Sequence, residues 1–411
     1  MWLVACCAAQ AAFAQLTLEG CQRAARENYP LVKQFGLIER TREFNLENAS
    51  KGYLPQLSVS GKASYQSDVT EMPFHIPGLE FGLDKDQYQA VVELNQMIWD
   101  GGAIRQQRRE ARAQADVQKG QLDVNLYALR DRVNQLYFGI LLIDARLEQN
   151  RLLQEQLARN YAQVEACVEL GVATQADLDA VRVEQLDARQ KAAELGVNRK
   201  AYMETLGLLT GEDYPVHERL LQPSSGNRAY GGLRRPELSF YASRRKQLDV
   251  QEKGLEARLM PRLGLFAQGA YGDPGLNMLK GGLEPYYIVG VRLSWNVGGF
   301  YTRKNDKRLL AASREEVDVQ EAAFRLENQM EASGHHYAVE RLDSLMRHDD
   351  ELIRLRTNIR RAAEAKVAEG TLTVTEMLRE VTAEDQARQA KALHEIQRLQ
   401  AIYDLKYTLN H

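Results

Sequence analysis

Two long stretches of the chain carry apolar residues at helical spacing and contain no proline. They run from 78 to 214 and from 286 to 411. A proline inside a helix costs about 3 kcal/mol or more, because it removes a hydrogen bond and clashes with the preceding turn. Steps of three, four or seven residues separate the apolar positions of two sets, Leu136, Ile140, Ile143 and Leu147, then Leu178, Val181, Ala188, Ala192 and Leu195. The pattern predicts long helices packed side by side.

Strict alternation of apolar and polar residues marks a second kind of element. It predicts four short β-strands, within 57–65, 88–96, 263–271 and 287–295. The strands are expected to form two β-hairpins, in 53–99 and 259–297. Aromatic residues stand at the strand ends, namely Tyr65, Tyr88, Tyr271, Tyr287 and Trp295.

The chain repeats its own pattern once. Pro30 and Pro55 recur 206 residues later as Pro236 and Pro261, while Gly171 and Thr174 recur 199 residues later as Gly370 and Thr373. Each copy reads as a helix, a β-hairpin and a long helical hairpin. The copies span 15–210 and 236–411, and the segment 211–235, rich in Gly, Pro and Ser, is predicted to be the linker.

A single glycine interrupts each long helical passage. Glycine adopts the left-handed conformation that ends a helix, so each interruption is predicted to be the tip of a helical hairpin. A threonine three residues later can cap the next helix, and an acid three residues further completes a capping box. The residues at this spacing are Gly171, Thr174 and Asp177 in the first copy and Gly370, Thr373 and Glu376 in the second.

The apolar faces of the strands leave two interpretations open. The hairpins could be ordinary ones packed on helices. Alternatively, the Leu, Val and Tyr phase could face lipid and the polar phase a lumen. Lipid tolerates no unpaired strand edge, and four strands are too few to close a barrel, since about eight is the practical minimum. Strands that span a membrane would therefore have to share a barrel between chains.

Composition and the N-terminus narrow the class of protein. The formal net charge of -3 offers no basic stripe of the kind that binds nucleic acid. No run approaches the roughly 18 to 20 apolar residues of a membrane-spanning helix. Residues 1–14 read as an export signal with a truncated start and an A-x-A site at Ala12-Phe13-Ala14; an ordinary buried segment is the alternative. Beyond that site only Cys21 and Cys167 remain, and both are predicted to be packing residues.

With these residues in place, the chain resembles the TolC family of outer-membrane efflux proteins. The most similar pieces are "LTLEGCQRAARENYP", "YLPQLSVSG", "LNQMIWDGG", "VRLSWNVGGFY" and the two Gly-x-x-Thr tips. The resemblance implies a mainly α-helical homotrimer in the outer membrane with a long periplasmic portion. Four strands per chain would build a shared 12-stranded barrel, and the long helical hairpins an α-barrel. In such a fold 211–235 is equatorial and the strand-end aromatics lie at the membrane interface.

The resemblance also implies a function, that of the exit duct of a tripartite efflux or type I secretion system. The expected partners are a periplasmic adaptor, or membrane fusion protein, and an inner-membrane pump of the RND or ABC type. The tip residues Gly171, Thr174, Asp177, Gly370 and Thr373 would face the adaptor.

A pore gate is a further implication. The family's best-known member has gate aspartates six and nine residues after the second tip glycine, where this chain has Glu376 and Arg379. Three copies of Glu376 could hold a pore open or attract cations. Arg379 could instead pair with Glu376 or Glu380 and hold the pore shut. Both residues could also be solvated surface charges.

The sequence gives less support to other classes of protein, such as an enzyme or a metal-binding protein. No phosphate loop, nucleophile elbow or zinc motif is present, so neither an enzyme nor a cofactor or metal site is expected. His335 and His336 are adjacent on a helix and point apart, and "RHDDE", 347 to 351, is predicted to be a solvated face. The main alternative is a periplasmic coiled-coil adaptor or scaffold without a channel. The transported substrate stays open.

Overall fold

The structure of the chain is a computed structural model that describes residues 16–70, 83–215, 217–226, 232–278 and 282–410. The predicted export signal, 1–14, lies outside the described residues. Among the helices that are described, none offers an apolar stretch able to cross a lipid bilayer. The elements are α1 (Leu18–Asn28), η1 (Pro30–Val32), α2 (Lys33–Lys51), β1 (Gln56–Tyr65), β2 (Asp86–Trp99), α3 (Ala103–Glu169), α4 (Gln175–Thr210), α5 (Pro236–Arg258), β3 (Arg262–Asp273), β4 (Glu284–Ser294), α6 (Gly299–Ala368) and α7 (Val374–Leu409).

The element order confirms the predicted class, mainly helical with four strands. Helix, strand, strand, long helix and shorter helix follow one another twice, first from α2 to α4 and then from α5 to α7. The long helices α3 and α6 have 67 and 70 residues. Neither contains a proline, so no backbone hydrogen bond is lost along them.

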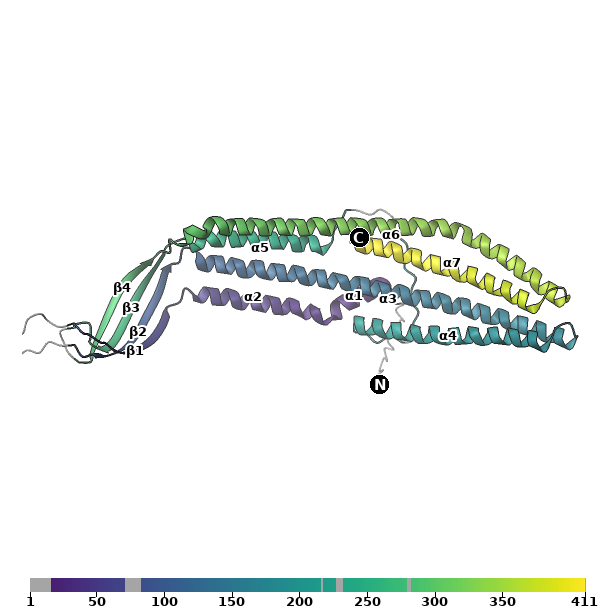
Figure 1. Ribbon diagram of the computed structural model, residues 1–411, viewed down its shortest axis with the longest axis horizontal. Helices are drawn as coiled ribbons and strands as arrows, with labels where there is room; N and C mark the ends of the chain where they lie inside the picture. The colour runs from purple at the N-terminus through teal and green to yellow at the C-terminus, as the bar shows by residue number, and fades with distance from the viewer. Residues whose placement is uncertain (1–15, 71–82, 216, 227–231, 279–281, 411) are drawn as a thin grey trace, which may run out of the picture. The chain divides into compact units, whose positions relative to one another are not determined.

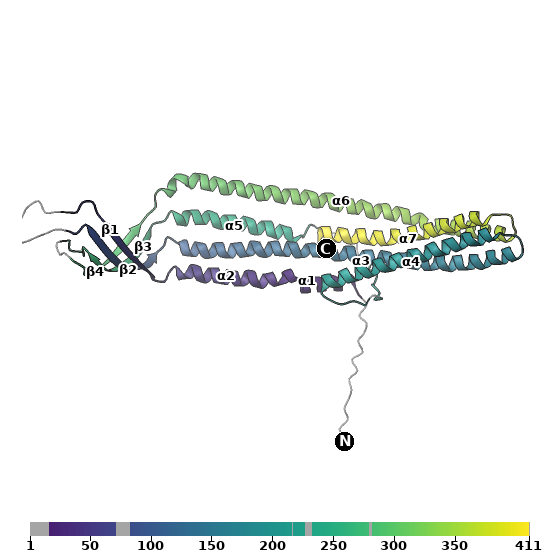
Figure 2. The same ribbon diagram turned by 60° about the horizontal axis from the view of Figure 1, so that its bottom comes forward.

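One compact unit contains the described parts of 1–34, 122–238 and 322–411. Within it α4 runs back along α3, and α7 along α6 (Figures 1 and 2). An ion pair joins the two helices of each hairpin, Arg199 with Asp144 in the first and Arg398 with Asp343 in the second. Both partners recur 199 residues later, the same offset that separates the two tip glycines. The repeat therefore continues through the packed helices, where the apolar pattern alone could not fix its register.

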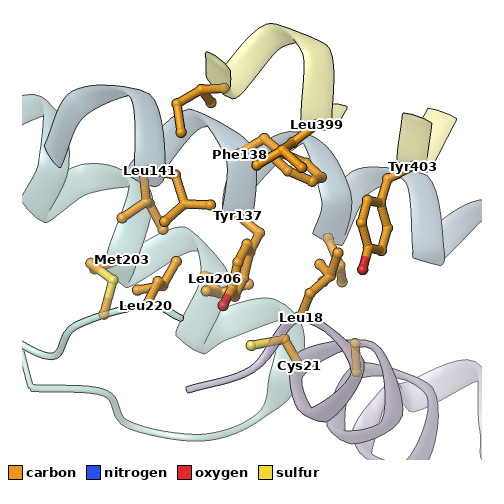
Figure 3. Packing of buried hydrophobic residues seen from close by; sticks show 14 of the residues in the cluster. Leu18, Cys21, Tyr137, Phe138, Leu141, Met203, Leu206, Leu220, Leu399 and Tyr403 are labelled. Atoms are coloured by element: carbon orange, nitrogen blue, oxygen red, sulfur yellow. The ribbon is translucent and has the colours of Figure 1, made fainter. Parts of the chain in front are cut away.

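A hydrophobic cluster in this unit draws on five segments. Tyr137 and Phe138 of α3 form its centre (Figure 3). Around them pack residues from α1, α4, the linker and α7, including Leu18, Cys21, Met203, Leu206, Leu220, Leu399 and Tyr403. The hydroxyl of Tyr137 lies 2.7 Å from the carbonyl oxygen of Leu16 and 2.6 Å from that of Leu221. The linker is thus packed into the unit.

The two cysteines behave as predicted. Cys21 and Cys167 are both buried and unpaired. Burial raises the pKa of the Cys21 thiol to about 12. A thiol with so high a pKa carries almost no thiolate and serves as an apolar packing group.

The other compact unit contains the described parts of 35–121 and 239–321. Its four strands form one antiparallel sheet in the order β1-β2-β3-β4 (Figure 1). The predicted alternation sets the register, with Val59 opposite Val92, Val92 opposite Gly269 and Gly269 opposite Tyr287. The unit combines strands from both sequence repeats, because β2 of the first repeat pairs with β3 of the second.

Candidate functional site

Both hairpin tips have the same backbone structure. Gly171 and Gly370 have φ angles of +73° and +71°, in the left-handed region. The amides of Gly171 and Val172 donate to the carbonyls of Val168 and Cys167. Gly370 and Thr371 make the matching bonds to Val367 and Lys366. These paired bonds close the end of each long helix.

The predicted capping boxes are confirmed in both hairpins. Thr174 accepts a hydrogen bond from the Asp177 amide at 3.3 Å, and the Asp177 carboxylate accepts from the Thr174 amide at 2.9 Å. In the second tip the Glu376 carboxylate accepts from the amide of Thr373 at 3.2 Å and from its hydroxyl at 2.8 Å. Each box satisfies helix amides that would otherwise lack partners.

The tip glycines support a stability prediction. We expect Gly370→Ala to destabilise the protein by about 1–2 kcal/mol, because a side chain disfavours the left-handed conformation. A Cβ at Gly370 would also lie 3.0 Å from Cγ1 of Val172 in the other tip. The matched control is Gly196→Ala, where a Cβ meets nothing within 4 Å inside helix α4. It should stabilise by about 0.5–1 kcal/mol. Thermal unfolding in detergent measures both, and equal shifts would refute the argument.

Glu376 and Arg379 are both exposed on the first turns of α7. Hydrogen bonds from Thr373, with a smaller effect of Arg379, lower the pKa of the Glu376 carboxyl. Glu376 is therefore ionised at neutral pH, and its carboxylate already completes the capping box with Thr373. Arg379 makes no hydrogen bond or ion pair within the described chain, and Glu380 pairs with Arg356 at 3.4 Å instead. The guanidinium of Arg379 is thus available to groups outside this chain.

Beneath the tips, the four helices of the two hairpins share an apolar cluster. Met377, Val181 and Val164 are fully buried in it. Further along α7 the same seam carries an acid, Glu384, which is only 5% exposed. Sequence analysis did not single out Glu384. The sequence feature that could have identified Glu384 is an acid among the apolar seam positions of a helix. In the first repeat the corresponding residue, 199 positions earlier, is Gln185.

Glu384 is held by a polar network that spans α6 and α7. Its carboxylate accepts from the hydroxyl of Thr357 at 2.7 Å, from Arg388 at 2.6 Å and from the guanidinium of Arg360. Burial alone would raise the pKa of Glu384, but these hydrogen bonds bring it below its ordinary value. Arg360 also pairs with Glu364 at 2.6 Å.

The same network reaches the first hairpin. Gln156 of α3 donates to the Glu364 carboxylate at 2.6 Å, and Gln163 donates to the Glu364 carbonyl at 2.9 Å. A hollow of about 210 Å³ opens beside it, lined by residues of α3, α6 and α7. A continuous chain of polar contacts therefore joins the two hairpins near their tips.

Asp385, next to Glu384, supports a prediction about how stability depends on pH. Its pKa is shifted upward, whereas that of Glu384 is shifted downward. Burial raises the pKa of its carboxyl from 3.8 to about 6, although Gln389 and Arg388 act against the shift. Between pH 4 and 6 the folded protein holds a proton that the unfolded chain has released, so stability should fall as the pH rises through this window. Asp385→Asn should flatten this fall and raise the melting temperature at pH 7. If Asp385→Asn shows the same dependence of melting temperature on pH as the unmodified protein, Asp385 is not the group that titrates in this window. Glu384 does not confuse the result, because its contribution to stability is lost only at more acidic pH.

The sheet has two unlike faces. One face carries the exposed apolar residues of all four strands, among them Leu57, Val59, Val92, Leu94, Leu265, Val289, Val291 and Leu293. The opposite face carries serines, glutamines and the charged side chains of Lys62, Glu93 and Arg292. This is the division of a sheet that meets lipid on one side and water on the other.

The predicted aromatic residues lie at the two ends of the apolar face. Tyr65, Tyr88, Tyr271 and Tyr287 are exposed toward the loop end, and Trp295 is exposed toward the helix end. Eight residues separate Tyr287 from Trp295, about 27 Å along a strand. That distance is close to the height of the apolar band of a membrane sheet, about 25 Å.

Trp99 is an aromatic residue at the helix end that the alternation did not single out. A register shift between Met97 and Trp99 places Trp99 opposite Leu263, on the apolar face. Strict alternation from Val92 and Leu94 assigns position 99 to the polar face. The bulge reverses the phase, and a single sequence gives no clear sign of it.

One expectation about charged residues is corrected. Residues 347–351 were predicted to form a solvated face, but Asp349 is buried on α6. Its carboxylate lies 2.9 Å from Nδ1 of His394 on α7. The residue belongs to the seam between the two helices, where a polar partner offsets its burial.

Comparisons with known proteins agree with this arrangement. The sequence model of the outer membrane efflux protein family matches residues 22–212. No curated protein matches the chain. Among solved structures, the outer-membrane channel OprN is 14% identical with a TM-score of 0.71, covering 95% of this chain and 89% of its own. VceC from Vibrio cholerae is 13% identical with a TM-score of 0.69 and 95% of both chains covered. CmeC from Campylobacter jejuni is 14% identical with a TM-score of 0.66, covering 95% of this chain and 85% of its own.

Proposed function

We propose that the chain belongs to the outer membrane efflux protein family, whose sequence model matches residues 22–212, and that it is the exit duct of a tripartite efflux or type I secretion system. In that role it would lie in the outer membrane, with a long helical portion in the periplasm. As a duct it would pass substrates from an inner-membrane pump and a periplasmic adaptor to the exterior. The observation that carries the proposal is the four-stranded sheet with one apolar face.

The edges of this sheet support an assembly of several copies. Within the described residues, β1 pairs only with β2, and β4 only with β3. Each unpaired backbone group would cost several kcal/mol in lipid. Pairing β1 of one copy with β4 of the next removes both edges. Three copies, the number found in the family, would close a twelve-stranded barrel.

An apolar stripe on α6 supports the same assembly. Met330, Tyr337, Leu345, Leu352 and Ile359 are all exposed in the single chain. They follow one another at steps of 7, 8, 7 and 7 residues. Because two helical turns take about 7.2 residues, these side chains lie along one side of the helix. Such a stripe fits a helix of a second copy.

The test of the proposed function is detergent extraction of outer membranes followed by electrophoresis with and without heating. A duct should migrate as a heat-modifiable trimer and conduct ions in planar bilayers. The competing hypothesis, a periplasmic adaptor or scaffold, gives the apolar face of the sheet no role. Recovery of the chain as a soluble periplasmic protein without conductance would reject the duct.

We place the adaptor contact at the two hairpin tips. Leu170 and Val172 expose apolar side chains there, 79% and 48%. Gly171, Thr174 and Asp177 fix the first tip, and the second tip has the equivalent residues. An exposed apolar surface on a rigid turn suits contact with another protein.

We also place Glu376 and Arg379 at the pore. Glu376→Ala and Arg379→Ala should each change single-channel conductance or cation preference in bilayers, because three copies of each charge would surround a narrow opening. Asp177→Ala is the matched control, since it removes the same capping box from the first hairpin. An equal change in Glu376→Ala and Asp177→Ala would assign Glu376 a capping role alone. No change in either Glu376→Ala or Arg379→Ala would remove both residues from the gate.

A further inference from the structure

The polar face of the sheet contains a flat aromatic ring. Phe266 of β3 stands opposite Gly290 of β4 in the register. A Cβ at Gly290 would lie 2.8 Å from Cε1 and 3.0 Å from Cζ of this ring. The ring therefore covers the backbone of Gly290 and lies along the sheet instead of standing away from it. Only glycine leaves room for this arrangement.

A guanidinium covers the ring. Arg292 lies two residues beyond Gly290 on the same face, and its Cζ is 4.6 Å from the centre of the Phe266 ring. Its two terminal nitrogens donate to Asn95 at 3.2 Å and to Glu93 at 3.1 Å, both on β2. Arg292 thus reaches from β4 across β3 to β2. These contacts hold the guanidinium over the ring.

The outer side of this stack is open. The Arg292 side chain stays 55% exposed although its guanidinium lies over Phe266 and its two terminal nitrogens donate hydrogen bonds. Lys62 and Arg262 occupy the same face of the sheet by register, against the acids Glu93 and Glu284. With Arg292 included, the strands place three cationic and two acidic side chains on this face, a net charge of +1 for each chain. The face would attract anions, and the guanidinium plane would accept a flat ring.

We propose that Phe266 and Arg292 form a binding platform inside the duct for planar aromatic compounds that carry an anionic group. The inference rests on the proposed function, because it requires the polar face to line the duct. The aromatic ring of the cargo stacks on the guanidinium, and the anionic group is drawn by the net positive face. Binding is weak and rapidly reversible, as a conduit requires for release.

The probe is naphthalene-2-carboxylate, measured by the concentration that halves channel conductance in planar bilayers. Cyclohexanecarboxylate, with the same charge and no aromatic ring, is the control compound. We expect naphthalene-2-carboxylate to block at the lower concentration. Arg292→Lys keeps the charge but loses the plane, and Phe266→Leu keeps an apolar side chain but loses the ring. Each should raise the half-blocking concentration about three- to fivefold.

A variant of a second cationic residue on the polar face separates the effect of aromatic stacking on block from the effect of charge. Lys62→Gln should weaken both carboxylates alike and preserve their ratio. If the two compounds block equally, or if Arg292→Lys and Phe266→Leu leave the ratio unchanged, the platform does not exist. Fluorescence anisotropy of the naphthalene compound with detergent-solubilised protein gives a reading that needs no conductance. Binding sensitive to both variants in a non-conducting protein would reject the duct and keep the platform, whereas conductance without selective block would do the reverse.

Discussion

Glu384→Ala is expected to destabilise the protein by about 3–5 kcal/mol, the cost of leaving a buried charge without its partner. Arg360 is only 9% exposed and would keep just Glu364 as an acidic neighbour. The hydroxyl of Thr357 would lose its acceptor at the same time. Loss of helical circular dichroism on heating the detergent-solubilised protein measures the effect.

The first sequence repeat supplies the control for Glu384. Gln185 occupies the matching seam position and makes two hydrogen bonds: its amide nitrogen donates to the Leu157 carbonyl at 3.2 Å, and its amide oxygen accepts from Arg182 at 2.8 Å. Gln185→Ala should therefore cost about 2 kcal/mol, roughly 1 kcal/mol for each hydrogen bond and less than the cost of stranding a buried charge. Replacing the buried pair together, as Arg360→Met with Glu384→Leu, should recover much of the loss, because no buried charge is then stranded. Equal destabilisation by Glu384→Ala and Gln185→Ala would show that the network contributes nothing beyond packing.

Local chemistry made several elements predictable from the sequence. Gly171 and Thr174 specify a tip because a left-handed glycine and a threonine cap act within a few residues, and the structure has both. The alternation from Leu57 to Tyr65 specifies a strand with two unlike faces, which the register confirms. The fold class could be predicted because such local signals occur in the same order in both sequence repeats.

Features that depend on packing were not predictable in the same way. The burial of Glu384 and Asp349 depends on the helices packed against them. From sequence alone, an acid on a helix is predicted to be exposed to solvent. Trp99 lies on the apolar face because of a β-bulge, and no residue near it in the sequence indicates that bulge. The stack of Phe266 on Gly290 needed the register of β3 with β4, which joins residues 24 apart in sequence.

The two hairpins are similar in backbone and different in the charge of their seams. Position for position, the neutral Gln185 of the first becomes the ionised Glu384 of the second. The second hairpin also has the exposed Glu376 and Arg379 on its returning helix. The two copies thus share the tip geometry, whereas the second copy has a buried charge on its seam where the first has a neutral amide.

Val289→Arg is expected to prevent stable insertion of the assembled protein into the outer membrane. Val289 lies in the middle of β4 on the apolar face and is 69% exposed in the single chain. An arginine at mid-depth on the lipid face of a membrane sheet costs about 2–4 kcal/mol. Three copies would multiply that cost. The measurement is the amount of heat-modifiable trimer extracted from outer membranes.

The neighbouring residue tests which face meets lipid. Ile288 stands opposite Gln268 on the polar face, so Ile288→Arg adds the same charge one residue away on the other side of the sheet. Glu93 stands opposite Gln268 on the far side, so an acidic side chain lies in the same row of the sheet. Ile288→Arg should therefore leave trimer yield near that of the unmodified protein and alter conductance instead. If the two arginines reduce yield equally, neither face is specific for lipid; if Ile288→Arg is the more harmful, the assignment of the faces is reversed.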